Sequence, residues 1–414
     1  MREPHIRELV TSWTDSEKMS VVTTPTKEGR VVLNVGPSHP ATHGALQIIV
    51  ELEGETILRA DPVIGYLHRG VEKLAEGLTY HQFIPYTDRL NYVSSFLNNL
   101  AYCLAVEKML GIEAPERAQV LRVIFAEITR IMDHMVCLGA NVVDIGAFTP
   151  FLYMFNVREK AYDIFEECCG ARLTVSYCRV GGLSRDVPKD FADKVENFCK
   201  LTLDTISEVE KLLNHNRIFL ERTVGVGAIT QEEAINYGFT GPNLRATGKK
   251  WDLRKAFPYL TYDRYDFDIP TRDNGDTFDR YIVRMEEMKQ SVRIIRQALK
   301  DIPDGRVIIN DFKHALPDKE ETYNSIEGII HHFKQIMHGW NPPKGEFYSA
   351  IEVANGELGF YIVSDGTGKP YRLRIRPPCF IYYQAFERLI KGHMIADLIA
   401  ILGSINIVAG ELDR

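Results

Sequence analysis

The sequence lacks the features that define several protein classes. Its 414 residues contain no block of like charges and no apolar run near the ~20 residues that a membrane-spanning helix needs. Residues 1–18 lack the apolar core of a secretory signal. The net charge of -7 at pH 7 gives no basis for nucleic-acid binding. We therefore expect a globular chain without a membrane span of its own, which is compatible with a place against a membrane complex.

Cysteine is present without a metal-binding pattern. The seven cysteines form no CxxC or CxxxC pair, and they lie at positions 103, 137, 168, 169, 178, 199 and 379. An odd number of cysteines without a secretory signal indicates reduced thiols, most of them small buried side chains. The chain also contains no GxGxxG nucleotide loop. We predict that this chain holds no iron-sulfur cluster, zinc or nucleotide cofactor of its own.

The apolar pattern predicts a β-rich N-terminal part followed by long helices. Residues 30–62 read as strands, with a hairpin turn at residues 53–55. Apolar residues at helical spacing and a proline near one start predict helices over residues 85–111, from 114 for about seven turns, and over 154–169, 187–215 and 278–299. The predicted fold class is therefore α+β, mainly helical, with a long-helix core.

The second half of the chain predicts three further features. Residues 225–270 are rich in Gly, Pro, Tyr and Asp and read as a long ordered loop. A hairpin is expected at Asn355-Gly356, and residues 386–414 read as an apolar helix. Without repeats or a low-complexity linker, we expect residues 1–30 to form an N-terminal arm and residues 31–414 a single interleaved domain.

The stretch GPSHPATHG, residues 36–44, places His39 and His43 four positions apart. In a helix this spacing would put both imidazoles on one face and suit a metal. Pro37 and Pro40 oppose a helical backbone, because proline fixes φ, lacks an N–H and disfavours helix in the preceding residue. Metal binding by the pair stays an alternative, although no suitable third ligand lies nearby in the sequence.

Three more polar residues stand out against the apolar background. Tyr92 lies early in the first predicted long helix, Asp144 follows the end of the second, and Arg69 lies beside His68. A carboxylate among valine, isoleucine and alanine is costly to bury unless a partner pairs with it. Each residue alone is more often a cap, a salt-bridge partner or a solvated charge than a catalytic group, and only the set favours a site.

An ordered series of motifs carries a family resemblance. The motifs span residues 31–414 and read GPSHPATHG, GYLHRGVEK, YTDRLNYVS, EITRIMDH, VDIGAFTPF, HNRI, ERTVGVG, KKWDLRKAFPY, GDTFDRYIVRMEEMKQS, GFYIVSDGTGKPYRLRIRPP and GHMIADLIAILGSINIVAGELDR. The chain resembles the quinone-site subunit of respiratory complex I, the 49-kDa type, and more distantly the large subunit of nickel-iron hydrogenases. The resemblance implies a hydrogenase-large-subunit-like fold.

The resemblance to hydrogenases gives a further reason to expect no metal bound by cysteines in this chain. Hydrogenase large subunits hold nickel through two CxxC pairs, because soft thiolates suit nickel and iron. Here RGVE stands where the first pair would be, and GELDR stands where the second would lie. The resemblance therefore implies that the metal site has become a cavity for an organic acceptor.

The resemblance also assigns roles to individual residues. It implies that His43 and Tyr92 contact the quinone head group, that His39 lines or supports its entrance, and that Asp144 hydrogen-bonds His43. Reducing a quinone takes two electrons and two protons, so donors that can also release protons suit this task. Imidazole titrates near ~6.5 and a phenol near ~10. A carboxylate behind an imidazole fixes the ring orientation and favours its protonated form.

Electrons must reach such a site from another chain. The resemblance implies a neighbouring subunit that holds a tetranuclear iron-sulfur cluster, with Arg69 close to it, where a fixed positive charge would raise its potential. Many members of the family carry a histidine at the position of Thr174, and that histidine is associated with the pH dependence of the cluster. Threonine cannot titrate, so we predict a potential with weak pH dependence, suited to a low-potential quinone such as menaquinone.

The function expected from the resemblance is that of a peripheral-arm subunit of proton-pumping NADH:quinone oxidoreductase. Its partners would be quinone, the iron-sulfur subunit and other complex I subunits, including the membrane arm, at the cytoplasmic face of the inner membrane. Two alternatives stay open. One is the same subunit in a ferredoxin-driven or other membrane-bound oxidoreductase, and the other is a non-catalytic scaffold.

Overall fold

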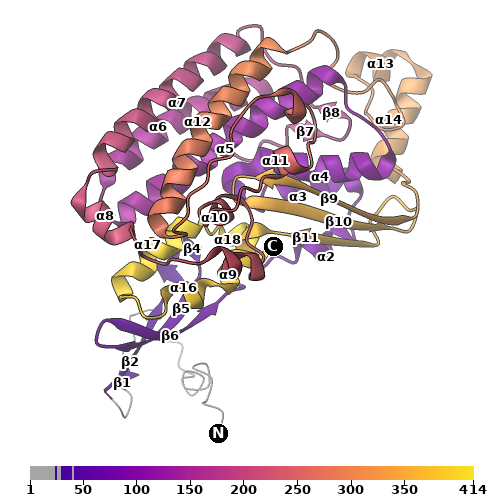
Figure 1. Ribbon diagram of the computed structural model, residues 1–414. Helices are drawn as coiled ribbons and strands as arrows, with labels where there is room; N and C mark the ends of the chain where they lie inside the picture. The colour runs from indigo at the N-terminus through magenta and orange to yellow at the C-terminus, as the bar shows by residue number, and fades with distance from the viewer. Residues whose placement is uncertain (1–23, 26–28, 40–41) are drawn as a thin grey trace.

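The computed structural model describes residues 24–25, 29–39 and 42–414. Within this part of the chain, long helices form the body and small antiparallel sheets lie against it (Figure 1). This arrangement confirms the predicted α+β, mainly helical class. Most of the arm predicted over residues 1–30 lies outside the described residues, although residues 24–25 pair with the next strand of the N-terminal sheet.

The N-terminal sheet has antiparallel strands in the order β1-β2-β5-β6. Their bounds are Thr24–Pro25 for β1, Val31–Val35 for β2, Gln47–Glu53 for β5 and Thr56–Val63 for β6. The turn between β5 and β6 confirms the predicted hairpin. Ile48 and Val50 of β5 are buried against apolar residues of the C-terminal helices, so one face of this sheet covers a core.

Long helices form the main core around α5. Their bounds are Ser95–Leu110 for α4, Glu116–Asp144 for α5, Phe148–Cys169 for α6, Phe191–Leu213 for α7 and Thr277–Lys300 for α12. The helix α5 packs against α6, α12 and α17 (Ile395–Ile405), and 22 of its 29 residues are buried. Helices on several sides of α5 thus cover most of its surface.

The C-terminal sheet packs on α4. Its strand order is β11-β10-β9, with bounds Gly345–Val353 for β9, Gly356–Ser364 for β10 and Arg372–Arg376 for β11. The β9–β10 pair turns immediately before Gly356, which confirms the predicted hairpin. The turn residue Asn355 is fully buried, unlike most turn residues, because its side chain belongs to a buried polar cluster that includes Cys379.

The helix predicted over residues 85–111 is wrong in its first part. The helix α3 (Tyr80–Thr87) ends first, and the 3-10 turn η2 (Tyr92–Ser94) then precedes α4. The Asn91 side chain accepts a hydrogen bond of 3.2 Å from the backbone N–H two residues on, which starts the new turn. The predicted site residue Tyr92 therefore lies in a short turn before the helix rather than inside it.

Two other helix starts differ from the predictions. The helix predicted from residue 154 begins at Phe148, since Pro150 occupies its first turn, where proline is tolerated. The proline expected inside the first turn of α5, Pro115, is instead the residue immediately before it, with an extended ψ of 149°.

The loop predicted over residues 225–270 is interrupted by short helices. Their bounds are Gln231–Asn236 for α9, Gly241–Arg245 for α10, Leu253–Ala256 for α11 and Tyr262–Arg264 for the 3-10 turn η3. Thr230 and Glu233 form a reciprocal capping box that starts α9, a pattern already visible in the sequence. The Asp252 side chain starts α11 by accepting a hydrogen bond from the Arg254 backbone N–H, so the prediction of one long loop over this region is wrong.

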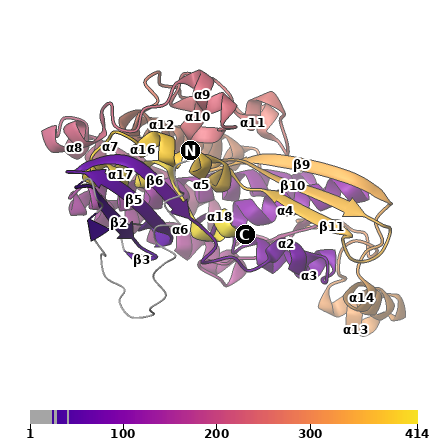
Figure 2. The ribbon, with the colours of Figure 1, turned by 90° about the horizontal axis from the view of Figure 1, so that it is seen from below.

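The single apolar helix predicted over residues 386–414 is also wrong. The chain forms α15 (Pro378–Gln384) and then α16 (Phe386–Ile390), α17 and α18 (Ala409–Asp413). Asn406 ends α17 in the left-handed conformation, with a φ of 56°. Because the chain changes direction at this break, α18 lies in the middle of the molecule, between the N-terminal and C-terminal sheets (Figures 1 and 2).

Among the described residues, the remaining elements are two pairs of short strands and four helices, two of which form a projecting pair. The bounds of these elements are Ser38–His39 for β3, Gly44–Ala45 for β4, Val71–Ala75 for α2, Cys178–Arg179 for β7, Gly182–Leu183 for β8, Arg217–Thr223 for α8, Lys319–Asn324 for α13 and Ile326–His338 for α14. The pair α13–α14 projects from the body (Figures 1 and 2). Large apolar side chains of α14 are exposed, namely Ile326, Ile329, Ile330, Phe333, Ile336 and Met337.

Segments far apart in the chain share the same cores. Strands of the N-terminal sheet pack on α16 and α17, and α4 packs on the C-terminal sheet. The single domain over residues 31–414 stays a prediction, which this packing supports. Among the helices that the structure describes, none is both long enough and apolar enough to cross a bilayer.

Candidate functional site

The loop between β2 and β5 carries both predicted histidines. Short strands β3 and β4 pair across it, with His39 opposite Gly44. The buried Thr42 hydroxyl bonds to two carbonyl oxygens, those of His39 at 2.7 Å and Gly44 at 2.9 Å. His43 has a φ of 55°, a conformation that a residue with a Cβ adopts at a cost and keeps only where its surroundings impose it. Pro40, one of the two prolines expected to stiffen this loop, lies outside the described residues.

The structure brings His43 and Asp144 together. The His43 imidazole N–H at Nε2 donates to the Asp144 carboxylate at Oδ2 over 2.5 Å, across 101 positions of the sequence. Each side chain is 16% exposed, so the pair is largely shielded but still open on one side. Asp144 is the last residue of α5, a long and largely buried helix of the body. A rigid helix therefore holds the carboxylate that orients the loop imidazole.

The C-terminal helix α18 lies behind both predicted quinone ligands. A Cβ on Gly44, next to His43, would lie 3.0 Å from the Cβ of Ala409. A Cβ on Gly410 would lie 3.1 Å from the ring carbon Cδ1 of Tyr92. Adjacent residues of α18 thus touch the loop that carries His43 and the turn that carries Tyr92. This places the two predicted donors in one neighbourhood.

Tyr92 is partly buried in this neighbourhood. Burial raises the pKa of its phenol, the nearby Cys379 thiol raises that pKa further, and the positive charge of Arg69 lowers it. The phenol therefore stays protonated at neutral pH and can donate a hydrogen bond. It would lose its proton only to a strongly basic acceptor.

Arg69 joins the RGVE segment to the C-terminal GELDR segment. Its guanidinium donates to the backbone carbonyl oxygens of Arg89, at 2.8 Å, and Gly410, at 2.9 Å. Three residues on, Glu72 lies 3.6 Å from the guanidinium of Arg414. RGVE and GELDR are therefore neighbours in space. Burial, followed by the like charge of Arg89, lowers the pKa of Arg69, which nonetheless remains a cation at neutral pH.

Thr174 lies in the segment that follows α6. The Ser95 hydroxyl donates to the backbone carbonyl oxygen of the preceding residue, Leu173, and the Ser176 hydroxyl donates to the buried carboxylate of Asp88. The residue after Asp88 is Arg89, whose backbone carbonyl oxygen accepts a hydrogen bond from Arg69. The two residues predicted to lie near the partner's cluster, Arg69 and Thr174, are thus linked through one short stretch of chain.

His39 lies on the short strand β3. It belongs to the same loop as His43, and its side chain is exposed. Within the described residues, no group of three or more His, Cys, Asp or Glu side chains could hold a metal ion. The alternative of a metal bound by the two histidines therefore gains no third ligand among those residues.

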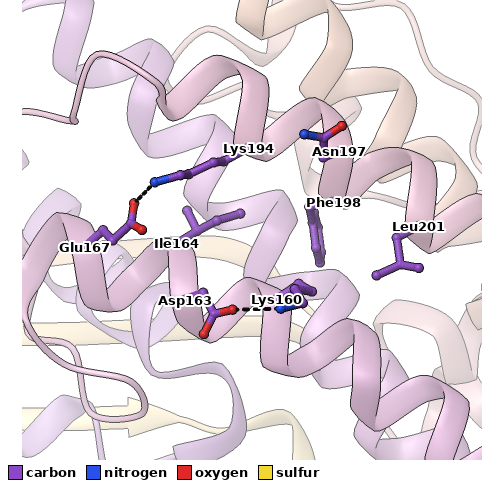
Figure 3. A pocket seen from close by; sticks show the side chains of 8 residues that line it. All are labelled: Lys160, Asp163, Ile164, Glu167, Lys194, Asn197, Phe198 and Leu201. Carbon is purple, nitrogen blue, oxygen red and sulfur yellow. Dashed lines mark hydrogen bonds and ion pairs between the residues drawn. The ribbon is translucent and has the colours of Figure 1, made fainter.

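A hollow between α6 and α7 is unrelated to this neighbourhood. It measures about 270 Å³, and the charged side chains along it pair with one another, as Lys160 does with Asp163 and Lys194 with Glu167 (Figure 3). Since each of these charges already has a partner, the hollow presents no unpaired charge to a ligand.

The structure adds polar residues that the sequence analysis did not single out. Glu411, Cys379, Asn355 and Asn406 are buried together directly behind the neighbourhood of Tyr92. The signal in the sequence was Glu411 itself, a carboxylate inside the apolar terminal segment INIVAGELDR, where burial needs an explanation.

Comparison with known proteins identifies the family. Residues 144–414 match the model of the family described as respiratory-chain NADH dehydrogenase, 49 Kd subunit. The chain belongs to this family. The chain is 53% identical over 384 residues to the NADH-quinone oxidoreductase D subunit of Geotalea uraniireducens, covering 93% of this chain and 98% of the relative. It is 51% identical over 385 residues to the corresponding D subunit of Myxococcus xanthus, covering 93% of each.

A further relative is named as a C/D subunit. The NADH-quinone oxidoreductase C/D subunit of Bdellovibrio bacteriovorus is 53% identical over 382 residues, covering 92% of this chain and 68% of the relative. These matches confirm the predicted family and, with it, an oxidoreductase subunit of the respiratory chain. The roles of individual site residues stay predictions.

Proposed function

We propose that this chain forms the quinone head-group site of a proton-pumping NADH:quinone oxidoreductase. Electrons would reach the quinone from an iron-sulfur cluster in a neighbouring subunit, and this chain would hold no cofactor itself. The observation that carries the proposal is the hydrogen bond between His43 and Asp144, which orients a loop imidazole beside the helix that also touches Tyr92. The relatives named NADH-quinone oxidoreductase support the same substrate.

The proposed chemistry assigns one task to each residue. Two electrons and two protons convert a quinone to a quinol, and negative charge builds on the carbonyl oxygens as the electrons arrive. His43 and Tyr92 would donate hydrogen bonds to these oxygens and then protons, which solvent replaces. Asp144 would hold the imidazole in place through the hydrogen bond to its Nε2. After His43 gives up its proton, Asp144 would lose its cationic partner, and we propose that this change initiates the coupling to proton pumping.

The surroundings fit a subunit of a larger assembly. Arg69 would hold a positive charge near the partner's cluster, and Thr174 would lie near it without titrating. The exposed apolar side chains of α14 form a patch of the kind that partner chains cover. We propose a peripheral place at the cytoplasmic face of the inner membrane, in contact with the iron-sulfur subunit, other complex I subunits and the membrane arm.

The test is quinone reduction by the assembled complex that carries His43→Ala. An artificial acceptor that takes electrons upstream of the quinone measures electron entry in the same preparation. We expect quinone reduction to fall by at least about 100-fold while the upstream rate stays, because a proton donor is lost. His215→Ala is the matched control, since His215 is exposed and far from α18 in sequence, and it should leave both rates unchanged.

The alternatives predict other results. A non-catalytic scaffold predicts that His43→Ala changes neither rate, which would overturn the proposed site. A ferredoxin-driven complex predicts a quinone defect with reduced ferredoxin as donor and no oxidation of NADH by the native complex. Comparing the two donors therefore separates the site from its electron source.

A further inference from the structure

Glu411 is a carboxyl buried in the centre of the fold. It lies on α18, directly after Gly410, which touches Tyr92, and it is 1% exposed. Its carboxyl oxygens accept from the Cys379 thiol at 3.1 Å and from the Cys379 backbone N–H at 3.4 Å. No lysine, arginine or histidine of the described residues pairs with it. A buried carboxylate without a cation is costly, so the neutral form is favoured.

A chain of hydrogen bonds leads from Glu411 back to the turn that carries Tyr92. The Asn355 amide donates to the Cys379 sulfur at 3.4 Å. The Asn406 amide donates to the Asn355 side-chain oxygen at 2.5 Å and to the Asp133 carboxylate at 2.7 Å. The Asn91 amide donates to the same carboxylate at 2.8 Å, and Asn91 caps η2. Buried polar groups thus connect the carboxyl to the backbone that positions Tyr92.

The ionisable groups around Glu411 favour its protonated form near neutral pH. Burial raises its pKa to about 7, the hydrogen bond from Cys379 opposes this rise, and the negative charge of Asp133 adds to it. Tyr92 and Arg69 face the neighbouring Gly410, and Arg69 is bonded to its carbonyl oxygen. The carboxyl is therefore poised to change its protonation when the charge nearby changes.

We propose that Glu411 binds a proton from solvent when negative charge arrives on the quinone head group, and releases it when the neutral quinol has formed. The inference rests on the proposed function. Two electrons come from the partner's cluster and two protons are transferred to the quinone, so the Glu411 proton is additional and returns to solvent. Glu411 is a positioning residue in this scheme, because it acts on the site through charge and not by touching the quinone.

The expected size of the effect follows from electrostatics. A negative charge at about 10 Å, in a medium of effective dielectric constant about 20, raises the pKa of a carboxyl by about one unit. A carboxyl with a pKa of about 7 is half ionised at pH 7, so this rise would make it take up about 0.4 of a proton as the quinone is reduced. Quinone reduction should consequently depend on pH through this group.

The test is the pH profile of quinone reduction by the assembled complex that carries Glu411→Gln, between about pH 6 and about pH 8.5. The amide keeps the size of the side chain and cannot titrate. We expect the titration step near pH 7 to disappear from the rate, while electron entry through the upstream acceptor keeps its own profile. A profile that superimposes on that of the unaltered complex would overturn the proposal.

Two substitutions at Cys379 test the proposal even where Glu411→Gln does not assemble. Cys379→Ser supplies a stronger donor to the carboxylate, which should move the step to lower pH by about one unit. Cys379→Ala removes the side-chain donor and should move it to higher pH. Shifts in the same direction, or none, would contradict the proposal. If His43→Ala has no effect on quinone reduction, the proposed function fails; if only the profiles are unchanged, this inference alone fails.

Discussion

Arg69 donates a hydrogen bond to the backbone carbonyl oxygen of Gly410, a residue 341 positions further along the chain. The same guanidinium binds the carbonyl oxygen of Arg89, so three segments meet at one cation. These segments are the loop before α2, the chain between α3 and η2, and the C-terminal helix α18. Hydrogen bonds from one arginine therefore hold the RGVE segment against the C-terminal GELDR segment.

Asp144→Asn should lower the rate of quinone reduction by about tenfold or more, because an amide neither stabilises a protonated imidazole nor fixes its orientation as a carboxylate does. The measurement is the maximal rate with quinone, with electron entry followed by the upstream acceptor. Asp163→Asn, an exposed carboxylate on α6, should change neither rate. A normal quinone rate in Asp144→Asn would show that the hydrogen bond to His43 is only structural.

Gly410→Ala should displace Tyr92 and weaken the complex. An added Cβ would lie 2.6 Å from the Leu90 carbonyl oxygen and 2.7 Å from that of Arg89, distances that require backbone movement. We expect less assembled complex and a raised KM for quinone in what assembles. Gly77→Ala is the control, because its Cβ would find only an ordinary contact of 3.5 Å. Equal behaviour of the two variants would contradict the close packing of α18 on η2.

Thr174→His should introduce a pH dependence into the potential of the partner's cluster. The hydroxyl of threonine does not ionise in this range, whereas an imidazole changes charge near ~6.5. Potentiometric titration of the cluster by electron paramagnetic resonance, at several pH values, measures the effect. The unaltered complex should show a weak dependence and the variant a steeper one. A steep shift already present in the unaltered complex would contradict the role given to this position.

Arg245→Met should be strongly destabilising. Its guanidinium lies 2.5 Å from the Glu287 carboxylate and 2.7 Å from that of Glu352, and all three side chains are fully buried. Removing the arginine leaves buried carboxylates without their cation, a cost of about 3–5 kcal/mol. Arg293→Met, which removes exposed ion pairs on the same helix as Glu287, should cost no more than about 1 kcal/mol. Thermal inactivation of quinone reduction by the assembled complex compares the two variants, and similar losses would contradict the prediction.

Glu411 should make the C-terminal segment less stable as the pH rises. Burial raises its folded-state pKa from an ordinary value of 4.5 to about 7, so the unfolded segment loses this proton at lower pH than the folded one. Opening then becomes easier between these two pH values, by on the order of 3 kcal/mol. Hydrogen exchange of residues 406–414 in the complex, corrected for intrinsic rates, measures this. Glu411→Gln should remove most of the pH dependence of this exchange. Equal pH dependence in the variant and the unaltered complex would contradict the prediction.

The parts of the fold that local pattern determines were predictable from the sequence. The hairpin at residues 53–55 and the one at Asn355-Gly356 follow from turn chemistry, and the long helices follow from apolar spacing. The breaks within apolar segments were not predictable in this way. Asn406 interrupts an otherwise helical pattern because its side chain bonds to Asn355 and Asp133, partners that the sequence places far away.

The candidate site likewise has a part that was predictable from the sequence and a part that was not. The motif GPSHPATHG marks the loop, and the family resemblance pairs His43 with Asp144, a contact that the structure contains. The apolar segment around Glu411 marks its carboxylate as unusual but does not name its partners, because these come from α5, α15 and the β9–β10 turn. Long-range packing creates such a cluster, so only the folded chain reveals it.

The buried amides behind Tyr92 also constrain how the sequence can diverge. Asn91, Asp133, Asn355 and Asn406 each satisfy a neighbour, so a substitution at one position leaves an unpaired polar group at the next. A change at one of them is tolerated when a compensating change accompanies it. We therefore expect these positions, although hundreds of residues apart in the chain, to change together across the family.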